Sequence, residues 1–301
     1  MRSCTILILT LGLTLICGTS RADLAGYQGV INGQSPMYYN TFDNTLAPSV
    51  GTGTFAATNG APYFGASAWG DANSAVYFGS TTDQLSYATA GNIVSGANTS
   101  TGVGSLSLLF YVPSTWRTTG NPTNNMVIFS DNDTTAPTQF SLNTGTGGLL
   151  QYKFGNRSTT MLPAGSLAGG NWYYLAWTWD GTIAVNTSNC FNWYIGALTN
   201  GAVLQTGGAL RGSTSPNIGT TGFGGNAGPF VVSGKQAGAT TGLASGTSPG
   251  AVDELATWSR VLTTTEINSQ FAAAIIPEPS TVTLIALGGL LLIGVRARSR
   301  R

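Results

Sequence analysis

Histidine is absent from this chain of 301 residues, and charged residues make up only 8% of it, against about 25% in typical soluble domains. Without histidine the chain lacks the base of a Ser-His-Asp triad or of a Cys-His pair, and it has no imidazole ligand for a metal. The formal net charge of +1 excludes the basic surface that nucleic-acid binding requires. We therefore expect no nucleic-acid partner.

Cysteine is scarce as well. Of the three cysteines, Cys4 and Cys17 lie within the first 22 residues, which leaves Cys190 without an intrachain disulfide partner. With no histidine to activate its thiol, Cys190 is predicted to be a buried spectator. The chain is nevertheless 42% hydrophobic and 10% aromatic, so it has ample apolar surface to bury and is not a disordered polar tract.

The N-terminus is typical of a secretory signal peptide. Arg2 precedes an apolar stretch over residues 6–16, and Ser20-Arg21-Ala22 places small residues at the −3 and −1 positions of a cleavage site. We predict a signal peptide over residues 1–22, cleaved after Ala22, in preference to a buried N-terminal helix. The exported domain is then 23–276, where six basic and ten acidic residues leave a net charge of −4.

Three elements follow one another at the C-terminus: Pro277-Glu278-Pro279, an apolar run over 281–295, and a tail with four arginines. Fifteen helical residues span about 22 Å, short of the roughly 30 Å hydrocarbon core, and the arginines are expected to stay cytoplasmic. Residues 277–301 closely resemble the PEP-CTERM sorting signal of Gram-negative bacteria. The resemblance implies an inner-membrane intermediate whose C-terminal helix is removed by an exosortase-type system, and then display at the cell surface or in the extracellular matrix. A plain C-terminal membrane anchor is the alternative.

The middle of the chain has the pattern of an all-β domain, with short apolar runs separated by Gly, Thr, Ser and Asn clusters. Alternation at Leu106, Leu108, Phe110 and Val112 predicts a strand with one face on a core. Residues 172–179 are apolar on both faces, which predicts a central strand.

The neighbouring segments complete this secondary-structure prediction. Asp180-Gly181 is a hairpin signal, with 191–195 as the returning strand and Gly196 ending it. Residues 200–250 are predicted to be long surface loops. One helix is expected after the capping box Thr263-Thr264-Thr265-Glu266, fading near Ala274.

Several of these segments resemble laminin-G-like domains. They are residues 38–42, 75–79, 106–112, 172–181, 194–196, 250–255 and 258–267, of which the closing segment from Gly250 onward is the most specific. The resemblance implies an antiparallel, concanavalin A-like jelly-roll β-sandwich with a short C-terminal helix. It also implies that Asp253 and Glu254 are structural, tying the terminal strand to nearby backbone.

A glycosidase of this fold needs two carboxylates about 5 Å apart. The exported domain contains only two glutamates, Glu254 and Glu266, and no Glu-x-Asp-x-x-Glu strand. We therefore predict no enzymatic activity and no catalytic residue, although an aspartate pair assembled by folding stays an open alternative.

Two kinds of binding residue are predicted. Asp131-Asn132-Asp133 offers the oxygen ligands that calcium prefers, and laminin-G-like domains often bind calcium at loop tips, but the same tripeptide is an ordinary turn sequence. Trp69 and Trp116 lie in polar surroundings and could stack on sugar rings, or could equally cap the ends of the core.

The sequence thus predicts an exported, non-catalytic binding or adhesion module whose partners are polysaccharides or surface glycans. A structural matrix protein without a discrete ligand is the first alternative, and a glycoside hydrolase is the second. The binding role rests on the family resemblance, because a fold does not determine a function.

Overall fold

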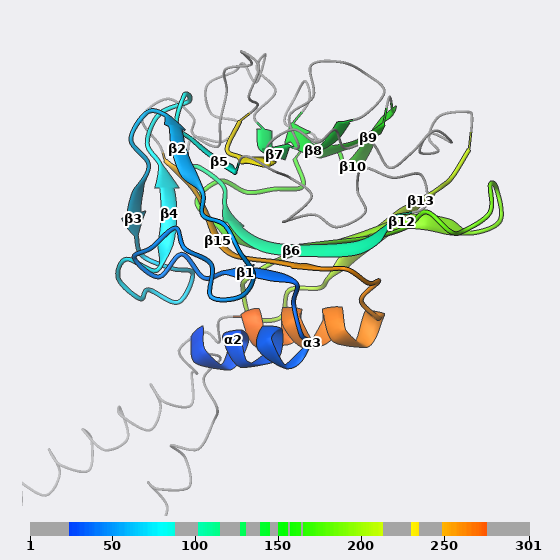
Figure 1. Ribbon diagram of the computed structural model, residues 1–301, viewed down its shortest axis with the longest axis horizontal. Coiled ribbons are helices and arrows are strands. Elements are labelled where there is room, and N and C mark those ends of the chain that lie inside the picture. The colour runs from blue at the N-terminus through cyan, green and yellow to red at the C-terminus, as the bar shows by residue number, and fades with distance from the viewer. Residues whose placement is uncertain are drawn as a thin grey trace, which may run out of the picture.

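In the computed structural model, two antiparallel sheets and two helices form a β-sandwich with a helical layer (Figure 1). The structure describes residues 24–87, 102–114, 127–130, 139–144, 150–155, 157–163, 165–212, 230–234 and 249–275. The prediction of an antiparallel β-sandwich with a short C-terminal helix is confirmed.

The larger sheet contains eight strands in the order β13-β12-β11-β6-β15-β4-β3, and β1 pairs with β15 beside β4. Its strands are β1 (Tyr38–Asn40), β3 (Tyr63–Gly65), β4 (Ala75–Phe78), β6 (Val103–Tyr111), β11 (Trp172–Asp180), β12 (Asn189–Ala197), β13 (Gln205–Leu210) and β15 (Gly250–Trp258). The last strand therefore lies in the middle of the sheet and joins the N-terminal and C-terminal parts of the domain.

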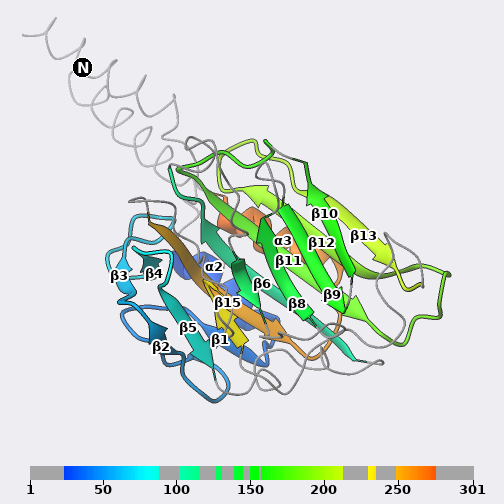
Figure 2. The same cartoon turned by 90° about the horizontal axis from the view of Figure 1, so that it is seen from above.

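The smaller sheet contains seven strands in the order β10-β9-β8-β7-β14-β5-β2. Its strands are β2 (Ala56–Asn59), β5 (Gln84–Tyr87), β7 (Val127–Ser130), β8 (Gln139–Thr144), β9 (Leu150–Gly155), β10 (Arg157–Leu162) and β14 (Phe230–Val232). Figure 2 shows β8 and β9 lying over β6 and β11 of the larger sheet. The strands β13 and β14 fall where the sequence predicted long loops.

The inter-sheet core is rich in aromatic rings. Trp177 of β11 lies with its ring centroid 4.9 Å from that of Phe129 and 5.1 Å from that of Phe191. Leu106, Leu108, Phe110 and Val112 are all fully buried in this core, so the predicted alternation is confirmed. The opposite face of β6 is buried in the middle of the strand, where Leu109 packs in the core on the helix side.

β11 is a central strand between β12 and β6, as its two apolar faces predict. The hairpin predicted at Asp180-Gly181 is confirmed, because β12 pairs antiparallel with β11, but its connection is longer than a tight turn. Gly181 is not among the residues with positive φ, and eight residues separate β11 from β12. Asp180 instead accepts a hydrogen bond from the Thr182 amide at 2.9 Å and opens this longer loop.

Gly196 does not end the returning strand, since β12 continues through Ala197. A Cβ atom at Gly196 would lie 2.5 Å from the ring of Phe271. The glycine therefore serves the close approach of a helix to the sheet rather than the end of a strand.

The helix α3 (Thr264–Ala274) has the predicted boundaries. Thr263 accepts a hydrogen bond from the Glu266 amide, and Glu266 returns the bond by accepting from the Thr263 amide. Ile267 and Phe271 are buried against the larger sheet. This end of the fold is specified locally, because a capping box needs only residues three apart in sequence.

The helix α2 (Leu24–Gly33) has no counterpart in the sequence prediction. Its ten residues include three glycines, which lower helix propensity by about 1 kcal/mol each. Tyr27 and Ile31, four residues apart, are both fully buried against the larger sheet and α3. Packing rather than propensity therefore stabilises this helix. Among the described residues neither helix is long and apolar enough to cross a membrane, and the predicted membrane segment 281–295 lies outside them.

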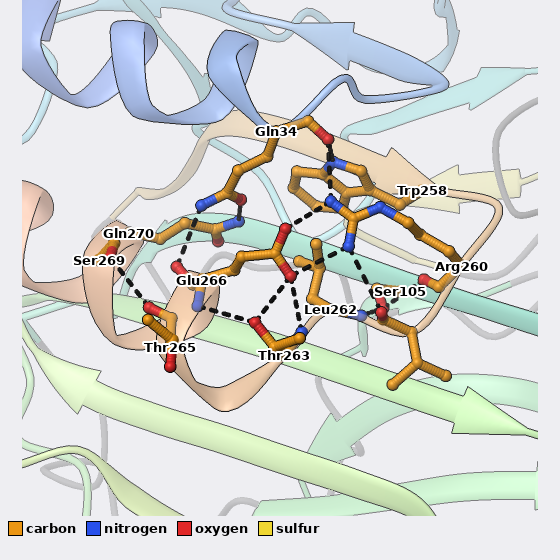
Figure 3. Close-up of polar contacts among 11 residues, drawn as sticks. Gln34, Ser105, Trp258, Arg260, Leu262, Thr263, Thr265, Glu266, Ser269 and Gln270 are labelled. Carbon is orange, nitrogen blue, oxygen red and sulfur yellow. Dashed lines mark hydrogen bonds and ion pairs between the residues drawn. The ribbon is translucent and has the colours of Figure 1, made fainter.

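Gln34, directly after α2, connects the two helices (Figure 3). Its backbone carbonyl accepts hydrogen bonds from the Trp258 indole and the Arg260 guanidinium, each at 3.1 Å. Its side chain donates to the Glu266 carbonyl and accepts from Gln270 at 2.6 Å. The segment after α2 is thus held by both β15 and α3.

Candidate functional site

Trp69 is the predicted ligand-binding residue that the structure describes. Its ring packs against Tyr27 of α2 with centroids 5.4 Å apart, and it is a partly buried member of the cluster between the larger sheet and the helices. Its indole Nε1 is buried without a hydrogen-bond partner among the described residues. These contacts match the packing role that the sequence left open, while a role in sugar binding stays a prediction.

The other predicted site residues lie outside the described residues. They are Trp116, the tripeptide Asp131-Asn132-Asp133, the cleavage residue Ala22, and the sorting signal Pro277, Glu278 and Pro279. Calcium binding and processing at both ends therefore stay predictions. Within the part of the chain that the structure describes, no group of three or more acidic, histidine or cysteine side chains is placed to hold a metal ion.

Asp253 and Glu254 form a buried acid pair in the middle of β15. The pairing with β6 shifts register between Asp253 and Ala256, and Glu254 has a φ of 56°. Such a bulge re-aims side chains that would otherwise alternate between the two faces of a strand. Both acids are completely buried, and the carboxylate of Glu254 lies beneath α2.

The contacts of Glu254 come from two other elements. The Tyr39 hydroxyl of β1 donates to one carboxylate oxygen of Glu254, and the Gln28 amide of α2 donates to the other at 3.0 Å. Gln28 also donates to Asp43 at 3.2 Å. Both carboxylate oxygens of Asp253, and the hydroxyls of Tyr27 and Ser107, have no hydrogen-bond partner among the described residues. Glu254 therefore ties β15 to side chains of α2 and β1, rather than to backbone as the family resemblance implies.

Burial determines the charge of this pair. It raises the pKa of Glu254 to about 8, against the lowering effect of the hydrogen bonds from Gln28 and Tyr39. Burial, followed by repulsion from Glu254, raises the pKa of Asp253 well above its ordinary value. Both shifts favour the protonated, uncharged form, which is the form of a carboxyl group that burial penalises least.

The two glutamates of the domain do not form a catalytic pair. Glu266 forms an ion pair with Arg260 at 2.6 Å on the surface, and this hydrogen-bonded contact lowers the pKa of Glu266 to about 2. Glu254 is completely buried and out of reach of a polymer substrate. The two carboxyl groups therefore cannot act together on one glycosidic bond.

Four aromatic side chains gather on the face of the larger sheet that looks away from the smaller one. We call them the outer aromatic cluster, and they are Tyr63 of β3, Tyr77 of β4, Tyr111 of β6 and Trp172 of β11. Strand pairing aligns them, because Tyr63 pairs with Tyr77, Ala251 pairs with both Tyr77 and Tyr111, and Trp172 pairs with Tyr111.

The four rings form one compact group. Centroid separations are 5.6 Å from Tyr63 to Tyr77, 6.3 Å from Tyr77 to Tyr111, 5.6 Å from Tyr111 to Trp172 and 6.4 Å from Tyr77 to Trp172. Tyr63 is 48% exposed, and the other three rings are partly exposed. The cluster therefore forms a contiguous, partly solvated aromatic surface, and Trp172 also packs against the core between the larger sheet and the helices.

Two small residues hold the rings in place. Ala251 lies between Tyr77 and Tyr111 and is completely buried, so the two rings close over it. A Cβ atom at Gly65 would lie 2.6 Å from the ring of Tyr77, so the glycine leaves room for that ring. The Tyr77 hydroxyl donates to the Ala66 carbonyl at 2.9 Å, which fixes the ring further and leaves its oxygen lone pairs free to accept.

The sequence prediction did not find this cluster. Trp172 was assigned to a buried central strand, and the tyrosines lie far from it along the chain. The signal was present only as one aromatic residue near the end of each strand, and the order of strands in the sheet brings these residues together. What the arrangement offers chemically is apolar ring surface with hydroxyl groups at its rim.

Comparisons with known proteins bear on the fold. No family model and no curated protein matches the chain. The receptor-binding domain of botulinum neurotoxin mosaic serotype C/D is similar in structure, with a TM-score of 0.53 and 13% identity over 80% of this chain and 51% of that one. The serotype G binding domain gives a TM-score of 0.53 at 13% identity, over 79% of this chain and 51% of that one.

A third similar structure is the serotype D ligand-binding domain in complex with N-acetylneuraminic acid. Its TM-score is 0.51 at 11% identity, over 82% of this chain and 52% of that one. The chain spans about half the length of these solved domains. At such low identity the likeness concerns the β-sandwich fold alone.

Proposed function

We propose that this protein is an exported, non-catalytic carbohydrate-binding module of a Gram-negative bacterium, working at the cell surface or in exopolysaccharide. The outer aromatic cluster is the observation that carries the proposal. Aromatic faces stack on the apolar faces of sugar rings, and the tyrosine hydroxyls can bond sugar hydroxyls. The domain, a jelly roll of the laminin-G-like type, displays this surface, and a PEP-CTERM tail handled by an exosortase-type system sorts it.

Two further observations support a binding role. Structures of similar fold include a receptor-binding domain and a ligand-binding domain in complex with N-acetylneuraminic acid. The two glutamates of the domain are not placed as a catalytic pair, since Glu254 is buried and Glu266 is paired with Arg260. A binding module needs no catalytic pair of carboxyl groups, only an exposed surface such as the outer aromatic cluster.

A glycan array tests the proposal. We expect the full-length protein, purified in mild detergent, to bind a subset of glycans, and the double variant Tyr63→Ala/Trp172→Ala to lose that binding while keeping the circular dichroism spectrum of the parent. Val203→Ala is the matched control, because Val203 is 79% exposed and outside the cluster. An array without signal would favour a structural matrix protein. Glycan binding that survives in the double variant would place the site elsewhere.

A further inference from the structure

Four buried polar atoms beneath α2 have no hydrogen-bond partner among the described residues. They are the two carboxylate oxygens of Asp253 and the hydroxyl oxygens of Tyr27 and Ser107. All three side chains are completely buried. Folded proteins rarely leave buried polar atoms unpaired, and a buried carboxylate is the most costly of them. Four such atoms in one place therefore point to a ligand.

The four atoms lie close together, although they come from three elements. Asp253 of β15 pairs with Leu109 of β6, whose side chain lies in the core on the helix side. Ser107 stands two residues before Leu109, so it lies on the same face of β6. Tyr27 reaches this face from α2. Burial raises the pKa of its hydroxyl, and Glu254, Ser107 and Asp253 are among the neighbouring groups that act on it.

The charged side chains that act on Asp253 are all acidic. They are Glu254, which is completely buried, and Asp43 and Asp71, which are exposed. The two arginines whose side chains the structure describes bind elsewhere, one to a loop carbonyl and the other to Glu266. Asp253 therefore takes no ion-pair partner from the described part of the chain.

A divalent cation matches the charge of the two buried acids. Burial raises the pKa of both Asp253 and Glu254 and so favours their protonated forms. Two protons keep the pair uncharged, and one divalent cation bound in place of two protons does the same. A monovalent cation would leave a net charge buried.

The donor atoms are of the kind that calcium prefers. Carboxylate and hydroxyl groups supply only oxygen, and calcium takes about six to eight oxygen ligands, among which carbonyl groups and water complement a few carboxylates. Zinc sites are built mainly from histidine and cysteine, but the chain has no histidine and Cys190 lies in the other core. No group of three or more acids is placed to hold an ion within the described ranges, so neutral oxygens have to complete the set.

We propose that Asp253, Glu254, Tyr27 and Ser107 form a calcium site between β15, β6 and α2. Asp253 offers both of its carboxylate oxygens. The oxygens of Glu254 each accept one hydrogen bond, from β1 and from α2, and each keeps a further lone pair for the ion. The site goes beyond the proposed carbohydrate binding and is separate from the tripeptide at 131–133.

Gln28 connects this calcium site to the surface. Its amide donates to the buried Glu254 at 3.0 Å and to the exposed Asp43 at 3.2 Å, so polar groups extend from solvent to the buried acids. Because Tyr27 and Gln28 both belong to α2, a bound ion holds α2 against the larger sheet. Calcium is therefore expected to stabilise the folded protein.

Thermal melting and terbium luminescence of the full-length protein in mild detergent test the site. The protein is stripped with EDTA and desalted, and Tm is measured by circular dichroism with added CaCl₂, MgCl₂ or EDTA. We expect a dissociation constant of about 10⁻⁵–10⁻³ M for calcium, and a rise in Tm of several degrees at saturation that EDTA reverses. Terbium, which replaces calcium in oxygen sites, is expected to luminesce when the nearby aromatic rings are excited, and calcium is expected to displace it.

Single variants connect the ion to these residues. Asp253→Asn keeps the shape of the side chain and is expected to abolish the rise in Tm and to weaken terbium binding at least tenfold. Since it breaks no hydrogen bond of the described residues, it is expected to fold in EDTA like the parent. Ser107→Ala, a second and milder variant, is expected to weaken calcium binding severalfold. Glu266→Gln is the matched control and should bind like the parent, because Glu266 is paired with Arg260 on the surface.

Three outcomes would overturn the proposal. The first is the absence of both a rise in Tm and terbium luminescence at concentrations up to about 10 mM, above the range of weak extracellular sites. The second is a calcium effect that persists in Asp253→Asn and disappears in Asp131→Asn, which would assign the ion to the tripeptide at 131–133. The third is an equal rise in Tm with NaCl of the same ionic strength, because screening of charge needs no site.

Discussion

At the scale of single residues, Glu254 links the stability of the protein to pH. Its pKa is about 8 in the folded protein and 4.5 ordinarily. Between these values the unfolded chain releases a proton that the folded protein retains. The stability is therefore fully present below about pH 4.5 and declines as pH rises toward 8. Asp253, whose pKa is also raised, acts in the same direction.

Urea unfolding between about pH 5 and pH 8.5 should show this dependence. We expect the free energy of unfolding to fall with rising pH, by up to about 1.4 kcal/mol per pH unit for each retained proton. Glu254→Gln should show a shallower slope because it removes one of these protons. Glu266→Gln is the matched control and should keep the parental slope, since the pKa of Glu266 is lowered to about 2 and it titrates only in acid. Equal slopes for Glu254→Gln and the parent would contradict this account.

At the scale of elements, the two helices differ in what forms them. The boundaries of α3 follow from a capping box and two buried residues four apart. By contrast, α2 forms in spite of its glycines, because Tyr27 and Ile31 are buried and Gln28 reaches Glu254. Gly29 serves no packing need, since nothing lies within 4 Å of the position of a Cβ atom there.

Replacing Gly29 by alanine should therefore stabilise the protein. We expect a gain of about 0.5–1 kcal/mol in the free energy of unfolding and a rise in Tm of a few degrees, measured by circular dichroism. The same substitution at Gly196 should destabilise it, because the new Cβ atom would lie 2.5 Å from the ring of Phe271. A loss of stability in Gly29→Ala would show that the glycine has a conformational role in α2.

At the scale of the whole molecule, the larger sheet is shared by two cores. One core lies between the sheets and the other between the larger sheet and the helices. β15 contributes Leu255 to the first and Trp258 to the second. Because a single sheet supports both, we expect the helical layer to be part of one cooperative unit rather than an appendage.

Alanine substitutions in the two cores test this expectation. Ile31 of α2 and Leu108 of β6 are both completely buried, and we expect each truncation to cost about 2–5 kcal/mol of unfolding free energy in urea titrations. Val203→Ala, on the surface, should stay within about 0.5 kcal/mol of the parent. If Ile31→Ala had a similarly small effect, the helical layer would be energetically independent of the sandwich.

Much of the fold could be predicted from local sequence. Alternation along β6, the two apolar faces of β11 and the capping box of α3 each involve residues that are close along the chain. The hairpin at Asp180-Gly181 was predicted correctly, but the length of its loop could not be, because a dipeptide is compatible with several loop lengths. The end of β12 was predicted wrongly. Gly196 leaves room for a ring from α3 and does not terminate its own strand.

The sequence by itself determined the all-β class, the closing helix and the absence of histidine chemistry, because these depend on composition and short-range pattern. Only the tertiary structure decided the rest. The bulge in β15 brings the carboxylate of Glu254 beneath a helix that local propensity does not favour. The outer aromatic cluster exists because strand order places Tyr63, Tyr77, Tyr111 and Trp172 side by side. Strand order depends on burying both faces of the sheet against segments that are distant in sequence. No short stretch of the sequence contains this information.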